Sequence, residues 1–177
     1  MKIYYIADPH FGHENSIHLN NRPFSNLDEM EQTLIANWNQ KVSGNDTIYI
    51  LGDLFFKNKK PFEWYLKQLK GRKHLIIGNH DGKLLKDPEI NSYFESISHY
   101  QEIRDGYTRC ILCHYPMLEW NGFFRGSLMI HGHTHQNLPA ALEVYRELPG
   151  LLNAGVEING YQPVTLEELI EFNKEYK

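Results

Sequence analysis

Three segments in the first half of the chain carry the pattern of β-strands. Each is rich in β-branched and aromatic residues, and each ends at a glycine or at a polar turn residue. The segments are KIYYIAD (2–8), DTIYILGD (46–53) and KHLIIGNHD (73–81). Helical patterns separate them, and this strand–helix–strand order predicts right-handed crossovers between parallel strands.

Two segments between these strands predict helices. Residues 25–42 repeat apolar side chains at the spacing that lines one helical face, namely Leu27, Met30, Leu34 and Trp38. Ser25 together with Asp28 has the pattern of a helix N-cap. The second predicted helix begins at Pro61 and ends at Gly71.

The second half predicts a hairpin, two more strands and a closing helix. HYQEIRDGYTRCILCHYP has the pattern of two antiparallel strands that turn at Asp105-Gly106. Two further strands follow: SLMIHGHTH (127–135) and LLNAGVEI (151–158). Residues 165–177 predict a helix that starts with a capping box of Thr165 and Glu168. The stretch QNLPAALEVYRELPG fits no single pattern, so no element is assigned to it.

Composition restricts the class of protein. The 177 residues suffice for one domain with a substantial core, and no linker or repeat divides residues 1–177. No apolar run approaches the roughly 20 residues of a membrane span. Asp8 interrupts the apolar start, so we expect no signal peptide and a cytoplasmic location. The net charge of −4 provides no general basic field for nucleic acid, and we interpret FKNKK (56–60) as a solvated loop.

The cysteines Cys110 and Cys113 form a C-x-x-C pattern, which is typical of redox pairs and of half zinc sites. No second C-x-x-C accompanies it, and the residues between the cysteines are apolar. On a strand, side chains three positions apart point to opposite faces, which disfavours pairing. We therefore expect two free core cysteines, as in a reducing compartment.

Residues that can bind metal recur where the predicted strands end. They are Asp8, His10, Asp53, Asn79, His80, Asp81, His114, His133 and His135. Ligand sites of open α/β sheets gather at the carboxyl ends of strands. Imidazole, carboxylate and carboxamide without thiolate suit Mn, Fe or Zn at a hydrolytic centre. This set exceeds the four ligands of one tetrahedral site and suits two ions that share a carboxylate.

Five separated motifs, in this order, are similar to those of the calcineurin-like metallophosphoesterases: DPH, GD, GNHD, a lone His and GHTH. The match runs from Asp8 to His135. The flanking stretches HFGHENSIHLNNRPF, IANWN and GVEINGYQPVTLEEL resemble a compact bacterial and phage branch of that family. The resemblance implies an α/β fold, with two β-sheets packed as a sandwich and flanked by helices in four αββα layers. The strand pattern alone supports only a mixed α/β fold.

The resemblance also implies a role for each motif residue. Three ligands would hold a first metal ion: Asp8, His10 and His135. Three would hold a second ion: Asn79, His114 and His133. Asp53 would bridge both ions together with a water or hydroxide that attacks the phosphorus. His80 would face the substrate and protonate the leaving group, with Asp81 orienting it, whereas His131 receives no role and is interpreted as structural.

Substrate contacts are expected from loops as well as from Asn79 and His80. Arg22 could clamp a phosphate in a bidentate way. In MLEWNGFFRG (117–126), Arg125 could hold a phosphate while the aromatic residues Trp120, Phe123 and Phe124 stack a base. The alternative, that these aromatic residues pack the loop onto the domain, stays open.

The chain is too short for a large cap domain, so we expect an open metal cleft that accepts groups on both sides of a phosphate. This favours a phosphodiesterase that acts on a nucleotide or another small diester, with Mn²⁺, Fe, Zn²⁺ or Ni²⁺ as the ions. A phosphomonoesterase is the alternative among enzymes. Long nucleic acid is disfavoured by the acidic charge balance. A binding scaffold of the same fold would be expected to have lost ligands or His80, and this chain keeps them all. The sequence indicates no oligomeric state.

Overall fold

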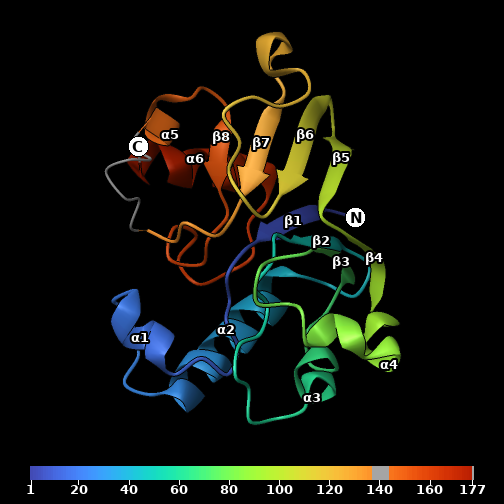
Figure 1. Cartoon of the computed structure of the whole chain (residues 1–177), viewed down its shortest axis with the longest axis vertical. Coiled ribbons are helices and arrows are strands. Elements are labelled where there is room, and N and C mark those ends of the chain that lie inside the picture. The colour runs from blue at the N-terminus through green and yellow to red at the C-terminus, as the bar shows by residue number, and fades with distance from the viewer. Residues whose placement is uncertain (137–143, 177) are drawn as a thin grey trace.

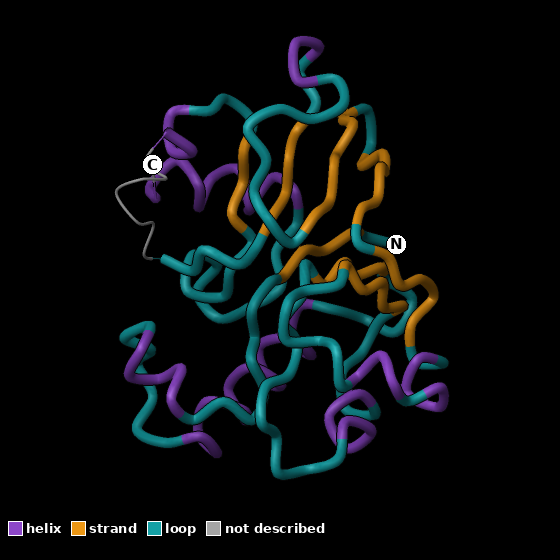
Figure 2. Tube along the Cα trace, viewed as in Figure 1, coloured by secondary structure: helices purple, strands orange, loops and turns teal. Residues whose placement is uncertain are grey.

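The computed structural model describes residues 1–136 and 144–176, and its strands form two four-stranded sheets (Figures 1 and 2). The first sheet is parallel throughout, in the order β1 (Ile3–Ile6), β2 (Thr47–Ile50), β3 (Arg72–Ile76) and β4 (Phe94–Ser98). The second has the order β5 (Tyr100–Asp105), β6 (Thr108–Cys113), β7 (Leu128–His131) and β8 (Leu151–Asn153). Its first pair is an antiparallel hairpin, and the other pairs are parallel. The two-sheet α/β sandwich that the resemblance implied is confirmed.

Helices connect and cover the sheets. The longer ones are α2 (Leu27–Lys41) and α6 (Leu166–Tyr176). The shorter ones are α1 (Asn15–Leu19), α3 (Phe62–Leu66), η1 (Leu84–Lys86), α4 (Pro88–Asn91), η2 (Phe123–Arg125) and α5 (Val144–Glu147). In Figure 1, α2, α3 and α4 lie on the side of the first sheet that faces away from the second sheet. In the described ranges, no helix combines the length and apolar character that a membrane crossing requires.

The core has three layers of apolar contacts. One lies between the first sheet and its helices, where Ile6, Ile48 and Ile50 meet Leu34 and Trp38. The second lies between the two sheets, and it contains Tyr5, Tyr49, Leu112 and Ile130. The third covers the outer face of the second sheet, where Ile111 and Met129 meet Trp120 and Leu148. Alternate residues of β1 thus enter different layers, as the two-residue period of a strand requires.

The predicted strands, the hairpin and their pairing directions are confirmed, whereas several element ends differ and the short helices α1 and α4 were not predicted. The N-cap of α2 is Asn26, whose side chain accepts a hydrogen bond from Glu29 N at 2.9 Å, so the prediction of Ser25 is wrong by one residue. The α3 helix ends at Leu66, five residues before Gly71. Strand β4 was not predicted. The unassigned stretch lies partly outside the described residues, and its later part contains α5.

Two local sequence predictions are confirmed by contacts. The capping box of α6 is present, because Thr165 N donates to Glu168 Oε2 at 2.9 Å and Glu168 N donates back to Thr165 Oγ1 at 3.4 Å. Both cysteines are free and buried. Cys110 faces the layer between the sheets, whereas Cys113 faces the outer layer, so the two thiols point away from each other as expected.

Candidate metal centre

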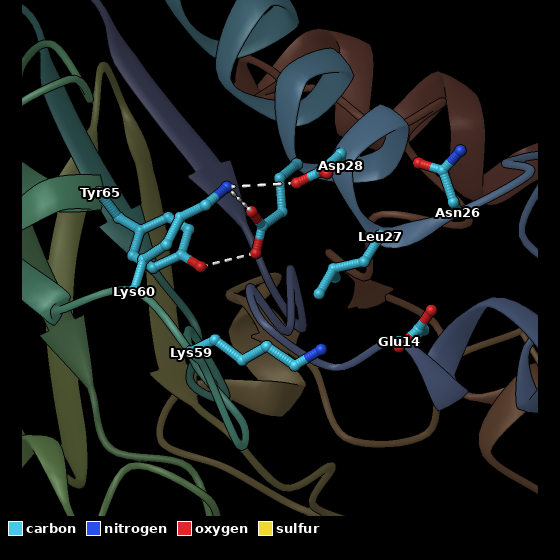
Figure 3. A pocket seen from close by; sticks show the side chains of 8 residues that line it. Glu14, Asn26, Leu27, Asp28, Lys59, Lys60 and Tyr65 are labelled. Atoms are coloured by element: carbon cyan, nitrogen blue, oxygen red, sulfur yellow. Dashed lines mark hydrogen bonds and ion pairs between the residues drawn. The ribbon is translucent and has the colours of Figure 1, made fainter.

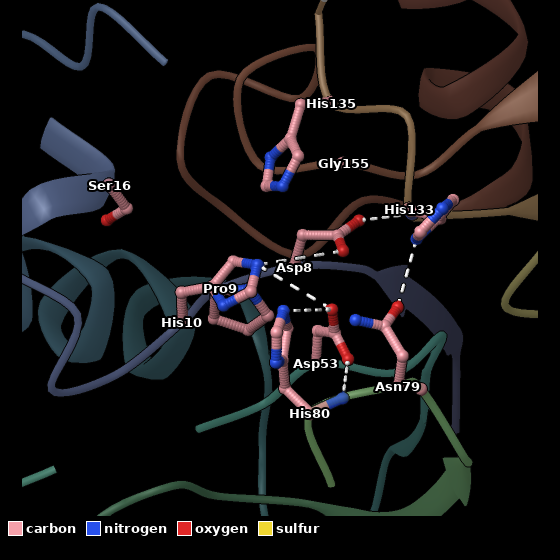
Figure 4. Close-up of polar contacts among 12 residues, drawn as sticks. Asp8, Pro9, His10, Ser16, Asp53, Asn79, His80, His133, His135 and Gly155 are labelled. Atoms are coloured by element: carbon pink, nitrogen blue, oxygen red, sulfur yellow. Dashed lines mark hydrogen bonds and ion pairs between the residues drawn. The ribbon is translucent and has the colours of Figure 1, made fainter. Parts of the chain in front are cut away.

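The loops that follow β1, β2, β3, β6 and β7 meet at one edge of the sandwich and bring the predicted ligands together. Figure 4 shows Asp53 at the middle of this group, with Asp8 and His10 on one side and Asn79 and His133 on the other. This convergence follows from the parallel pairing, since parallel strands carry their carboxyl ends to the same edge.

Asp8, His10 and His135 form the first half of the centre. One potential ligand atom from each lies within 4.8 Å of those of the other two. His10 Nε2 is 4.0 Å from Asp8 Oδ1, and the His10 and His135 rings stack with centroids 5.2 Å apart. Asp8 and His10 are buried, and neither Asp8 Oδ1 nor His10 Nδ1 has a hydrogen-bond partner among residues 1–136 and 144–176. A buried carboxylate oxygen without a donor is a place that a cation would satisfy.

Asn79, His114 and His133 form the second half. Asn79 Oδ1 is 3.0 Å from His114 Nε2 and 3.0 Å from His133 Nδ1. His114 Nδ1 donates to the carbonyl oxygen of Leu51 at 2.7 Å, so in the neutral ring Nε2 carries a lone pair. Burial lowers the pKa of His114, which favours this neutral form. A ring nitrogen with a free lone pair beside an amide oxygen provides two atoms that can bind the same metal ion.

Asp53 lies between the two halves. Its Oδ2 is 3.8 Å from His10 Nε2 in the first half and 3.6 Å from His114 Nε2 in the second. Its Oδ1 accepts a hydrogen bond from His80 N at 2.8 Å. Asp8, Asp53 and His114 also have ligand atoms within 4.8 Å of one another. The carboxylate therefore has the position that a shared ligand would need.

The local charge balance also fits cations. Burial raises the pKa of Asp8 well above its ordinary value, and the nearby Asp53 carboxylate raises it further. Burial also raises the pKa of Asp53. The pKa of His10 is lowered well below its ordinary value, by burial first and then by the neighbouring His135. Carboxylates that repel each other, beside an imidazole such as His10 whose pKa is lowered, are a ligand set that positive ions would compensate.

Backbone strain is concentrated in the same loops. Five of the seven predicted ligands have positive φ angles between 47° and 69°, namely Asp8, His10, Asp53, His133 and His135. This left-handed region is costly for residues other than glycine, and such strain clusters at functional sites. Glycines in neighbouring loops permit the backbone to lie close to the carboxylates of the centre. A Cβ at Gly78 would lie 2.3 Å from Asp53 Oδ1, and one at Gly132 would lie 2.6 Å from Asp8 Oδ2.

His80, which the resemblance assigns to the substrate side, lies at the rim of the centre. Its side chain is 35% exposed, and its Nε2 lies 3.9 Å from Asp53 Oδ2. Its ring packs against Phe56 with centroids 4.2 Å apart. It is thus the most accessible imidazole beside Asp53, next to buried His10 and His114.

Asp81 does not orient His80, and that prediction is wrong. Its buried carboxylate accepts three backbone hydrogen bonds instead, from Asp53 N at 2.9 Å, Leu54 N at 3.1 Å and Gly78 N at 2.8 Å. These bonds join the loop after β2 to the loop after β3. Asp81 therefore fixes the backbone of Asp53.

Arg22 does not face a substrate, so the prediction of a phosphate clamp is wrong for this residue. Its side chain is fully buried and forms an ion pair of 2.7 Å with Glu157, whose side chain is also buried. It also donates to the carbonyl oxygens of Asp8 and Pro9, each at 2.9 Å. Arg22 thus supports the strained loop that carries Asp8 and His10.

Glu157 is the residue that sequence reasoning missed. Its Oε1 accepts a hydrogen bond from His135 Nδ1 at 3.1 Å, which leaves His135 Nε2 for a metal ion. The signal was the lone carboxylate near the end of the predicted strand LLNAGVEI. His131 is buried at the end of β7, where its Nδ1 bonds to the carbonyl oxygen of Gly132 at 2.8 Å.

The loop that contains Trp120 and Arg125 lies far from the centre. It precedes β7, whereas His133 follows β7, so the strand separates them, and Figure 1 shows η2 at the opposite end of the second sheet. Trp120 is buried and donates to Ser127 O at 3.1 Å. Trp120 and Phe123 pack onto the sheet, whereas Phe124 is exposed to solvent. Because the loop lies at the opposite end of the sheet from the centre, the prediction that Arg125 holds substrate phosphate is wrong.

Comparisons with known proteins agree with this geometry. Residues 1–134 match the family model of the calcineurin-like phosphoesterases. An uncharacterized protein of Methanocaldococcus jannaschii, MJ1445, is 37% identical over 174 residues, which cover 96% of this chain and 90% of that protein. The gene 66 protein of Mycobacterium phage L5 is 29% identical over 171 residues, which cover 81% and 82% of the two chains.

A solved structure gives the same fold. The crystal structure of AQ665, a protein of unknown function from Aquifex aeolicus, matches with a TM-score of 0.72 at 33% identity. The match covers 96% of this chain and 97% of that one. The two-sheet architecture therefore extends to a relative across its full length.

Proposed function

We propose that this chain, which belongs to the calcineurin-like phosphoesterases and is a metal-dependent hydrolase, is a phosphodiesterase that acts on a nucleotide or another small diester. The observation that carries the proposal is the position of Asp53, within 4 Å of imidazole nitrogens from both halves of the centre and beside accessible His80.

Two divalent cations fit the donors that the chain provides. We assign Asp8, His10 and His135 to the first ion and Asn79, His114 and His133 to the second, with Asp53 shared. Such ions would supply an attacking hydroxide near neutral pH and neutralise charge on the phosphoryl group. Mn²⁺ is the ion that we expect to support activity best, because oxygen and imidazole ligands suit it and thiolates are absent from the set.

The residues of the chain would supply the remaining chemistry. Water adds to the phosphorus, the bond to the leaving oxygen breaks, and that oxygen needs a proton. His80 would donate this proton from its imidazole, because it is the exposed ring beside Asp53. Asp81 would act indirectly, since its three backbone hydrogen bonds hold Asp53 in position.

The preference for diesters rests on access. Asn79 is exposed and His80 is 35% exposed, so a phosphate at the centre would have room for substituents on both sides. A phosphomonoesterase remains the alternative. The prediction against long nucleic acid as a substrate and the prediction of a cytoplasmic location rest on the sequence alone.

The test is a paired assay on protein stripped of metal and reloaded with Mn²⁺. Bis-p-nitrophenyl phosphate and p-nitrophenyl phosphate are compared, with Asp53→Asn as the control. We expect turnover of the diester that the control loses. Turnover of the monoester alone would establish the alternative, and two bound ions without turnover of either compound would contradict the proposal and favour a binding scaffold.

A further inference from the structure

A cavity of about 320 Å³ opens directly beside His80. We call it the Phe56 cavity, and its walls include Phe55, Phe56, Phe62, Lys57, Lys83 and His80. Residues 55–58 come from the loop that follows Asp53, and residues 79–83 come from the loop that follows β3. Phe62 and Leu84 are the first residues of α3 and η1. Asn79 and His80 line both this cavity and the metal centre, so the two are continuous.

The Phe56 cavity combines aromatic walls with positive charge. Phe56 packs against the His80 ring, and Lys57 Nζ lies 5.2 Å from the centroid of the same Phe56 ring. Neither Lys57 nor Lys83 forms an ion pair with any described residue. No carboxylate side chain lines the cavity within the described part of the chain, although the whole chain has a net charge of −4.

A neighbouring cavity of about 230 Å³ shows the contrast (Figure 3). Its lysines are accompanied by three acidic residues, Glu14, Asp28 and Glu31. Lys60 Nζ is 2.7 Å from Glu31 Oε2 and 3.4 Å from Asp28 Oδ1, so its charge is compensated within the protein. The Phe56 cavity therefore differs from its neighbour in that lysines line it without any carboxylate among the described lining residues.

The position of His80 indicates which part of a substrate the cavity would receive. A group that protonates the leaving oxygen must lie beside it, so the leaving group has to occupy the side of the centre where His80 lies. The Phe56 cavity is on that side, since His80 forms part of its wall. Aromatic surfaces bind nucleobases by stacking, and lysine ammonium groups bind phosphate as point charges.

We propose that the Phe56 cavity binds the leaving group of the substrate, and that this leaving group is a nucleotide. Its base would pack against the phenylalanine walls, and its additional phosphate would contact Lys57 and Lys83. This inference rests on the proposed function, because it uses His80 as the proton donor, and it narrows the substrate to a diester of a nucleotide.

The test measures binding to Mn²⁺-loaded protein by calorimetry, with three probes that are recovered and checked for intactness. Adenosine 3′,5′-bisphosphate carries the base and a second phosphate, ribose 5-phosphate lacks both, and inorganic phosphate tests the metal centre alone. We expect the bisphosphate to bind at least about tenfold more tightly than ribose 5-phosphate. The double variant Lys57→Gln/Lys83→Gln should lose most of this difference and keep its affinity for inorganic phosphate.

The matched control is Lys59→Gln/Lys86→Gln, which removes the same charge from exposed lysines outside the cavity and should change nothing. Equal binding of the bisphosphate and ribose 5-phosphate would overturn the inference, as would equal losses in both double variants. Turnover of bis-p-nitrophenyl phosphate separates the two proposals. If turnover persists while nucleotide selectivity is absent, the cavity assignment is wrong and the phosphodiesterase stands.

Discussion

Among the three histidines with a ring nitrogen within 4 Å of Asp53, His80 is the most exposed, and it is not one of the seven proposed ligands. We predict that His80→Ala lowers kcat by about 10²–10⁴ for a diester with an alkyl leaving group, which needs a proton. The loss should be much smaller for a p-nitrophenyl leaving group, because that group departs as a stabilised anion. Steady-state kinetics on the two substrates, with metal analysis by mass spectrometry, checks this. A variant that loses metal would contradict the assignment.

Glu157 provides a second prediction at the scale of one side chain. It connects His135 to Arg22, and both side chains of the Arg22–Glu157 pair are fully buried. Glu157→Gln removes the charge that opposes the Arg22 guanidinium, and breaking such a pair costs about 3–5 kcal/mol of the free energy of unfolding. The weaker support of His135 should also reduce affinity for one of the two ions by about 10–100-fold.

A metal titration against a competing chelator measures this effect, and urea unfolding measures the loss of stability. Glu63→Gln, on the exposed face of α3, is the matched control and should change neither quantity. If Glu157→Gln kept both ions at wild-type affinity, the role of Glu157 in positioning His135 would be wrong.

At the scale of elements, Asp46 anchors the start of β2 and the N-terminal end of β1. Its carboxylate accepts hydrogen bonds from Ser43 Oγ at 2.6 Å, Ser43 N at 3.0 Å and Lys2 N at 2.7 Å. These bonds, with the Ser43 hydroxyl first, lower the pKa of Asp46 from 3.8 to about 2. Because the folded pKa is depressed, the stabilisation is complete above the ordinary value and is lost as the pH falls towards 2.

We therefore predict that Asp46→Asn lowers the urea midpoint relative to wild type by a constant amount between pH 5 and 7. The difference should shrink as the pH falls below about 4, where the wild-type carboxyl becomes protonated. Glu175→Gln, an exposed carboxyl on α6, is the control. A difference that stayed the same down to pH 2 would show that the charge of Asp46 contributes nothing.

The elements also show what the sequence could predict. Strands β1, β2 and β3 were predictable because they are short apolar runs that end at glycine or polar residues. The convergence of Asp8, Asp53 and Asn79 was predictable because they follow those runs directly. Strand β4, FESIS, mixes polar and apolar residues with mostly intermediate burial, so its pattern is weak. Asp81 accepts hydrogen bonds from three backbone N–H groups only because the fold brings the loop after β2 next to the loop after β3. No local sequence pattern predicts that contact.

At the scale of the whole molecule, the two wrong substrate predictions have one cause. Arg22 and Arg125 were chosen because they lie near candidate ligands in the sequence. Distance along the chain, however, does not show where the chain runs or which way a side chain points. The chain turns inward at Arg22, towards Glu157, and between His114 and β7 it returns to the far end of the second sheet. Similarly, hydrophobic periodicity shows which residues are buried but not which of two sheets a strand joins.

Metal binding should connect the centre to the stability of the entire fold. Two ions that bind only the folded chain raise its free energy of unfolding, by about 2.7 kcal/mol per site at a hundredfold excess over Kd. For a domain of this size, we predict that Mn²⁺ raises Tm by about 5 °C or more. In Asp53→Asn the rise should be much smaller, because the shared carboxylate is missing.

The same variant has the opposite effect on the metal-free protein. Burial raises the pKa of Asp8, and the Asp53 charge adds to this, so the two carboxylates repel each other in the buried centre. Removing one charge relieves that repulsion, and metal-free Asp53→Asn should be at least as stable as metal-free wild type. In calorimetric scans, Asp53→Asn should therefore have the higher Tm without Mn²⁺, and wild type should have the higher Tm with Mn²⁺. If Asp53→Asn were less stable in both conditions, its carboxylate would stabilise the fold itself, and the strain and charge of the centre would need another explanation.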